Sequence, residues 1–156
     1  MKRFYQFFAF VFVALAVVAC GDKNADLKAD LQAFNAATEQ NGNLAEIQQL
    51  QSQLMAAATP EEQAVIFNKI ADKYKAIKDS VTALNIKTAD AKSLKDKFVS
   101  GFDDFIKLMT DSATYVVTPP TAEQQQALVA LQQQATQKLM EAAQGVETLK
   151  AKAEAK

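Results

Sequence analysis

Few residues of this chain have the chemistry of a catalytic or metal site. The sequence contains one cysteine, Cys20, and no histidine. Without histidine there is no imidazole for acid–base catalysis, for a histidine-containing catalytic triad or for a histidine-ligated metal or haem. Two pairs of adjacent carboxylates remain, Glu61–Glu62 and Asp103–Asp104, but neighbouring residues on a helix point about 100° apart and do not flank one bond. We therefore expect no catalytic residues, no metal site and no enzymatic activity.

Cys20 closes an apolar segment near the start of the sequence. The two residues after Met1 are basic, and residues 4–19 are apolar apart from one glutamine and a tyrosine hydroxyl. This segment is shorter than the ~20 residues that a membrane-spanning helix needs. A positive start, a short apolar stretch and small residues before a boundary are typical of a secretory signal peptide. The alternative is a short, uncleaved membrane helix with an incidental cysteine.

The segment ends in Val17-Val18-Ala19-Cys20, which resembles the lipobox of the bacterial lipoprotein class. The resemblance implies that a dedicated signal peptidase cuts between Ala19 and Cys20 and removes residues 1–19. It also implies a diacylglyceryl group on the Cys20 sulfur and, in many bacteria, an acyl chain on the new amine. Two or more acyl chains anchor a protein stably, because each buried CH₂ contributes ~0.8 kcal/mol. We expect no cofactor beyond this covalent lipid.

The residue after the cysteine bears on the location of the protein. In lipoproteins of many Gram-negative bacteria an aspartate directly after the lipidated cysteine retains the protein in the inner membrane. Gly21 stands there instead, so the resemblance implies the bacterial outer membrane, with the domain facing the periplasm. Asp22 follows, and in some bacteria acidic residues slightly beyond the cysteine also matter, so the choice between inner and outer membrane and surface exposure stay open.

The composition excludes some classes of protein. The net charge is −1 with both signs mixed along the chain, whereas a nucleic-acid-binding protein needs a clustered basic face. With no cysteine after Cys20, an intrachain disulfide framework is excluded.

Apolar residues recur at helical spacing in four segments, and no segment has the pattern of a strand. The segments are 26–57, 60–85, 88–114 and 121–150. Short connections make consecutive helices antiparallel, so the sequence predicts an all-α, up-down four-helix bundle. We expect a lipidated cysteine and short tether at 20–25, the bundle domain at 26–152 and a frayed tail at 153–156. No carboxylate is expected on the apolar stripes.

Capping residues, glycine and proline predict where these helices begin and end. Thr59 and Thr121 each begin a capping box, TPEE and TAEQ. Gly42, within Asn41-Gly42-Asn43, fits either a turn that breaks the first helix into two or a kink within it. The proline pair at 119–120 must end a helix, and we expect residues 115–120 to be an extended connection.

Gly101 lies inside the third segment, where glycine costs up to ~1 kcal/mol relative to alanine. A closely packed neighbouring helix would explain it, and so would a mild flaw in the helix.

Aromatic residues in the third segment are the candidate partner or ligand contacts. They are Phe98, Phe102, Phe105 and Tyr115. An ordinary core is the favoured interpretation of this cluster, and a lining for an apolar ligand is the alternative. Phe102 lies at the flank of the stripe and Tyr115 in the proline-rich connection, so either would be a partner contact if exposed.

These features favour a lipid-anchored envelope lipoprotein whose bundle is a non-enzymatic protein-binding or structural module. Its expected partners are the membrane, through the lipid, and an envelope protein, with no nucleic acid and no metal. The alternative is a carrier or sensor that binds an apolar small molecule or lipid in the bundle core. A third hypothesis, a hydrolase that acts through carboxylates alone, is supported only by the abundance of Asp and Glu.

Overall fold

The computed structural model describes residues 24–39 and 43–155, and within them every regular element is an α-helix. The helices are α1 (Ala25–Glu39), α2 (Asn43–Ala56), α3 (Pro60–Thr82), α4 (Ala89–Val117) and α5 (Ala122–Glu154). The predicted all-α class is confirmed. The described residues form five helices rather than four, with separate helices before and after residues 40–42. Cys20, Gly21 and Gly42 lie outside the described residues.

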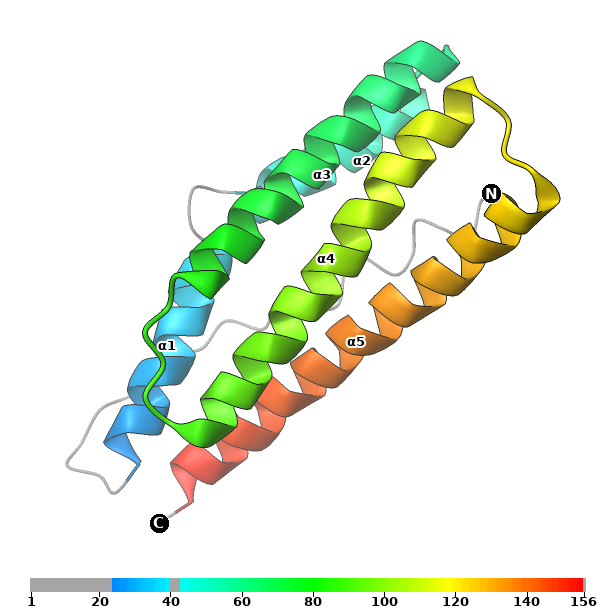
Figure 1. The fold of residues 1–156 in the computed structure, drawn as a ribbon. Helices are drawn as coiled ribbons and strands as arrows, with labels where there is room; N and C mark the ends of the chain where they lie inside the picture. Colours follow the sequence, from blue (N-terminus) through cyan, green and yellow to red (C-terminus); the bar gives the residue numbers. More distant parts are fainter. Residues whose placement is uncertain (1–23, 40–42, 156) are drawn as a thin grey trace.

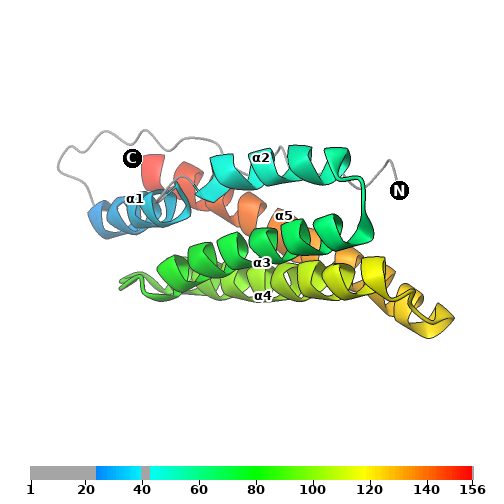
Figure 2. The same ribbon diagram turned by 90° about the horizontal axis from the view of Figure 1, so that it is seen from above.

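The three long helices lie side by side and alternate in direction, with α4 between α3 and α5 (Figure 1). The two short helices, α1 and α2, follow each other in about the same direction along α3 (Figure 2). α2 packs mainly against α3, whereas α1 packs against both α3 and α5. The molecule therefore has two distinct ends. At one end α1 begins, α3 connects to α4, and α5 ends. We call this the Asn24 end. The opposite end, where α2 connects to α3 and α4 to α5, is the far end.

α3 and α5 begin at the predicted capping boxes. The Thr59 hydroxyl accepts a hydrogen bond from the Glu62 amide at 3.2 Å, and the Glu62 carboxylate accepts one from the Thr59 amide at 3.3 Å. Thr121 and Gln124 exchange the equivalent bonds at 3.2 and 2.9 Å. Each box satisfies amides that have no partner within the helix, so both predictions are confirmed.

Apolar side chains from all five helices form one core. On α3 the apolar residues at helical spacing include Ile70, Ile77 and Val81, and all three are buried. The connection from α3 to α4 adds Ile86, which is only 5% exposed although it lies outside any helix. The core therefore continues to the Asn24 end of the molecule.

The close approach of α4 and α5 explains the glycine inside α4. A β-carbon at Gly101 would lie 2.6 Å from Leu139 Cδ2 and 3.0 Å from Leu139 Cγ. Both distances are far shorter than the 3.5–4.0 Å of an ordinary carbon contact. Of the two explanations that the sequence left open, the closely packed neighbour is the correct one.

Three helix ends differ from the prediction, and the first is that of α3, which ends at Thr82 rather than at residue 85. α4 continues through Val117, and only Thr118, which precedes the first proline, leaves the helix with φ −117° and ψ 106°. Proline restricts the residue directly before it more strongly than those further back. At the other end of the molecule, α5 extends to Glu154 and buries Ala153 to 2% exposure, where a frayed tail was expected.

Candidate functional site

Three of the four predicted aromatic contacts lie in the core. Phe98, Phe102 and Phe105 of α4 are 3%, 2% and 6% exposed. Their rings pack against other rings: Phe98 lies 5.8 Å from Phe34 of α1 and 5.9 Å from Phe102, and Tyr74 of α3 lies 6.1 Å from Phe102 and 5.5 Å from Phe105, measured between centroids. These spacings are those of favourable aromatic pairs. Burial raises the pKa of Tyr74. The cluster joins α1, α3 and α4, and Phe102 does not meet the condition of exposure that would make it a partner contact.

Of the five large apolar side chains that are exposed among the described residues, four lie toward the far end of the molecule, and the fifth is Met140 in the middle of α5. Met55 in the last turn of α2 is 69% exposed, and Val65 in the second turn of α3 is 53% exposed. Val117, the last residue of α4, and Val129, early in α5, are 48% and 49% exposed. We call these four residues the far-end surface. Tyr115, half-buried two residues before Val117, is the one aromatic candidate beside it.

The beginning of α5 explains part of this exposure. Residues 122–127 are exposed, and Leu128 and Leu131 are half-buried, although the sequence places both on the core-facing stripe of the last helix. α2 packs mainly against α3, so this part of α5 lies chiefly against α4. The later stripe residues Leu139 and Leu149 are buried as expected.

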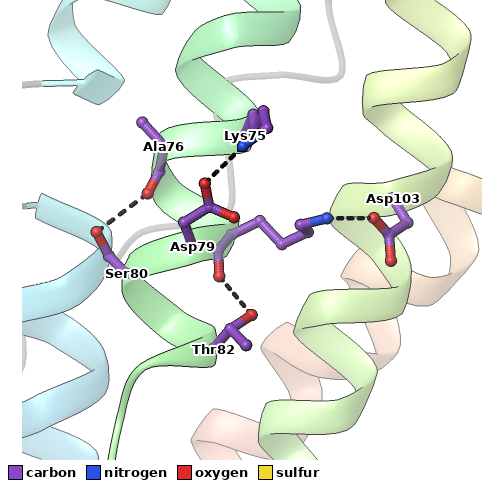
Figure 3. A network of polar contacts seen from close by, with 7 residues as sticks. Lys75, Ala76, Asp79, Ser80, Thr82 and Asp103 are labelled. Carbon is purple, nitrogen blue, oxygen red and sulfur yellow. Dashed lines mark hydrogen bonds and ion pairs between the residues drawn. The ribbon is translucent and has the colours of Figure 1, made fainter.

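The two adjacent aspartates of α4 serve packing between helices. Asp103 accepts from Lys78 of α3 at 2.8 Å (Figure 3), and Asp104 pairs with Lys138 of α5 at 2.6 Å. The side chains thus point to opposite neighbours, as their 100° divergence requires. The two carboxylates therefore do not converge on one position where a substrate could bind.

A buried carboxylate at the Asn24 end was missed by the sequence analysis. Asp30 of α1 is 3% exposed and accepts three hydrogen bonds from the start of α4: from the Lys87 amide at 3.0 Å, the Thr88 amide at 2.9 Å and the Thr88 hydroxyl at 2.7 Å. Thr88 occupies the N-cap position of α4, but its own side chain makes no capping bond. Asp30 therefore supplies from another helix the acceptor that this helix start needs.

The environment of Asp30 favours its charged form. Burial by itself raises the pKa of the carboxyl, but the two backbone amides, the Thr88 hydroxyl and the charge of Lys87 outweigh it and hold the pKa below its usual range. The expectation that no carboxylate lies on an apolar stripe was wrong at this position. The only sequence signal is its place between Leu27 and Leu31, on the buried side of α1.

Further contacts join the ends of the chain at the Asn24 end. The Asn24 side-chain amide donates to the carbonyl oxygens of Lys152 at 2.9 Å and of Ala155 at 3.4 Å. Asp26 pairs with Lys87 at 2.8 Å, and Asp90 at the start of α4 pairs with Lys152 near the end of α5. The start of α1 is thus fixed to the end of α5 and to the connection before α4.

The described residues contain no group of three or more His, Cys, Asp and Glu side chains placed to hold a metal ion. In the same residues, no helix combines the length and apolar character needed to cross a membrane.

A family model, described as "Uncharacterised lipoprotein PM1805", matches residues 24–156. The chain belongs to this lipoprotein family. No curated protein and no solved structure matches the chain. The matched residues begin after Cys20, so the family model and the lipobox resemblance are two separate indications of a lipoprotein.

The two ends of this lipoprotein differ in charge. At the far end, residues 53–63 and 114–126 contain Glu61, Glu62 and Glu123 and no lysine or arginine. At the Asn24 end, lysines stand beside the carboxylates: Lys87 pairs with Asp26, and Lys152 pairs with Asp90. The helix ends beside the far-end surface therefore carry only glutamates as charged residues, with Lys69 one turn beyond Val65, whereas the Asn24 end carries both charges.

Proposed function

We propose that this protein is anchored by lipid on Cys20 in the bacterial outer membrane, faces the periplasm, and acts as a non-enzymatic module that docks an envelope protein. Membership in a lipoprotein family supports the anchor, and the lipobox resemblance assigns the lipid to Cys20. Gly21, in place of an aspartate, supports the outer membrane.

The observation that carries the docking function is the far-end surface. Met55, Val65, Val117 and Val129 come from four different helices, and each is about half exposed or more. Single exposed apolar residues are common, whereas several toward the same end of a molecule are candidates for an interaction site. Because the charged residues nearest to them in sequence are acidic, the matching partner surface is apolar with lysine or arginine at its rim.

The carrier alternative has less support. It requires a ligand between the phenylalanines of α4, and those rings pack on one another and on Phe34 and Tyr74 at 5.5–6.1 Å. A ligand would have to separate them. Native mass spectrometry of the purified protein distinguishes the two functions, because a carrier would retain a lipid-sized mass and a docking module would not.

Site-specific photocrosslinking in intact cells tests the docking function. A photoreactive side chain replaces Val129 in one variant and, in the control, Thr110, an exposed residue of α4 that does not belong to the far-end surface. We expect a reproducible protein adduct from position 129 and none from position 110. The same adducts from both positions, or none from either, would contradict docking through the far-end surface.

A further inference from the structure

We infer that the Asn24 end of the domain rests against the phospholipid surface and that the far end projects away from it. This inference rests on the proposed lipid anchor at Cys20 and goes beyond it, because an anchored domain can also lie flat or swing freely. The occupant of the Asn24 end is the bilayer surface that holds the anchor.

The chain between the anchor and the folded domain is short. Four residue steps separate Cys20 from Asn24, which span at most about 14 Å when fully extended. α4, with 29 residues between the two ends, is roughly 40 Å long at 1.5 Å per residue. The tether therefore brings the Asn24 end to the membrane and cannot bring the far end there unless the domain lies down.

The start of α1 cannot easily unwind to lengthen the tether. Asn24 donates to the carbonyls of Lys152 and Ala155, and Asp26 pairs with Lys87. One turn later Asp30, 3% exposed, holds the start of α4. Unwinding the first turn of α1 would break contacts with both α5 and the α3–α4 connection, so the short tether stays short.

The charges at the two ends of the domain favour the same orientation. Phospholipid headgroups with a negative charge repel the glutamates of the far end, Glu61, Glu62 and Glu123, whereas lysines close to the surface are attracted by about 1 kcal/mol each. Lys87 and Lys152 have side chains 63% and 59% exposed and lie at the Asn24 end. Each of these two lysines is paired with an aspartate, so the net positive charge comes from the start of α4, where residues 87–97 contain four lysines and two aspartates.

The orientation places the far-end surface at a distance from the membrane. Val117 and Val129 lie roughly one helix length from the anchored end. A partner would thus bind in the aqueous compartment, away from the membrane surface. One end of the domain would lie beside the anchor, and the other would present apolar contacts.

Quenching of fluorescent labels by spin-labelled headgroups tests the orientation. The full acylated protein is purified from membranes and placed in vesicles of phosphatidylethanolamine and phosphatidylglycerol. A thiol-reactive fluorophore is attached in Lys92→Cys, in the first turn of α4 at the Asn24 end, or in Glu123→Cys or Met55→Cys at the far end; all three positions are exposed. Circular dichroism of each variant checks that the fold is intact.

We expect strong quenching at position 92. At positions 55 and 123 we expect no more quenching than in control vesicles that lack the spin-labelled lipid. Equal quenching at all three positions means that the domain lies flat and overturns the inference. Absent quenching at position 92, while the protein still floats with the vesicles and its mass includes the acyl chains, means that the domain stands away from the surface and overturns it too. A protein that neither floats nor carries acyl chains refutes the lipid anchor itself, and the inference with it.

Discussion

Replacement of Asp30 by asparagine tests the contact that joins α1 to the start of α4. The carboxylate is 3% exposed and accepts three hydrogen bonds at 2.7–3.0 Å from Lys87 and Thr88. Asparagine keeps the shape, but only one of its two terminal atoms is an acceptor, so at least one buried amide then faces an NH₂ group. An unsatisfied buried donor costs about 1–3 kcal/mol, and the remaining bonds lose the strengthening effect of charge. We expect the free energy of unfolding to fall by about 2–4 kcal/mol.

Urea unfolding followed by circular dichroism at 222 nm measures this loss. With an m-value of about 2 kcal/mol/M, the midpoint should fall by ~1–2 M. The matched control is Asp26→Asn, one turn earlier on the same helix, whose carboxylate pairs with Lys87 while 65% exposed. Exposed pairs contribute about 0–1 kcal/mol. Equal effects of the two substitutions would refute the role assigned to Asp30.

The same carboxylate predicts a pH dependence. Because the folded state holds the pKa of Asp30 below its usual range, the unfolded chain binds this proton at higher pH than the folded one. The stabilisation is therefore fully present above the unfolded pKa, near pH 4, and is lost as the pH falls through the lower folded pKa. Asp30→Asn should remove this part of the acid destabilisation. An unchanged acid profile in the variant would show that other carboxylates account for it.

Other substitutions test packing and capping by the same urea assay. Gly101→Ala should be less stable than Gly145→Ala by about 1–3 kcal/mol, because a β-carbon at 101 meets Leu139 at 2.6 and 3.0 Å, whereas one at 145 meets a single side-chain terminus at 3.0 Å; equal stabilities would contradict the close approach of α4 and α5. Phe102→Ala should cost about 3–5 kcal/mol, since the side chain is 2% exposed, and a cost below about 1 kcal/mol would mean that it lies at the surface. Thr121→Ala should cost about 1 kcal/mol through loss of the bond to the Gln124 amide; no loss would mean that the capping box does not form in solution.

Local signals predicted the helix starts and the fold class. The capping boxes at Thr59 and Thr121 depend on residues three apart, so the sequence contains the whole interaction. Periodicity likewise predicted the buried residues of α3. The sequence could only suggest a close neighbour at Gly101, because the partner, Leu139, is on another helix.

Long-range contacts account for what was missed. Asp30 finds its donors 57 and 58 residues later, and Asn24 finds a carbonyl 128 residues later. The contacts of Asp30 allow a carboxylate to be buried on an apolar stripe. The contact of Asn24 binds the last turns of α5, which extend beyond the predicted end of that helix. The candidate site differs from the predicted one for the same reason: Phe102 is covered by Tyr74 of α3, while Leu128 and Leu131 of α5 are only half-buried because α2 packs mainly against α3.

The central claim is that lipid on Cys20 anchors this protein, and the intact mass of the protein extracted from membranes tests it most directly. We predict a chain that begins at Cys20 and carries the added mass of a diacylglyceryl group, with or without a further acyl chain on its amine. A chain that still begins at Met1 and carries an unmodified thiol would contradict the claim.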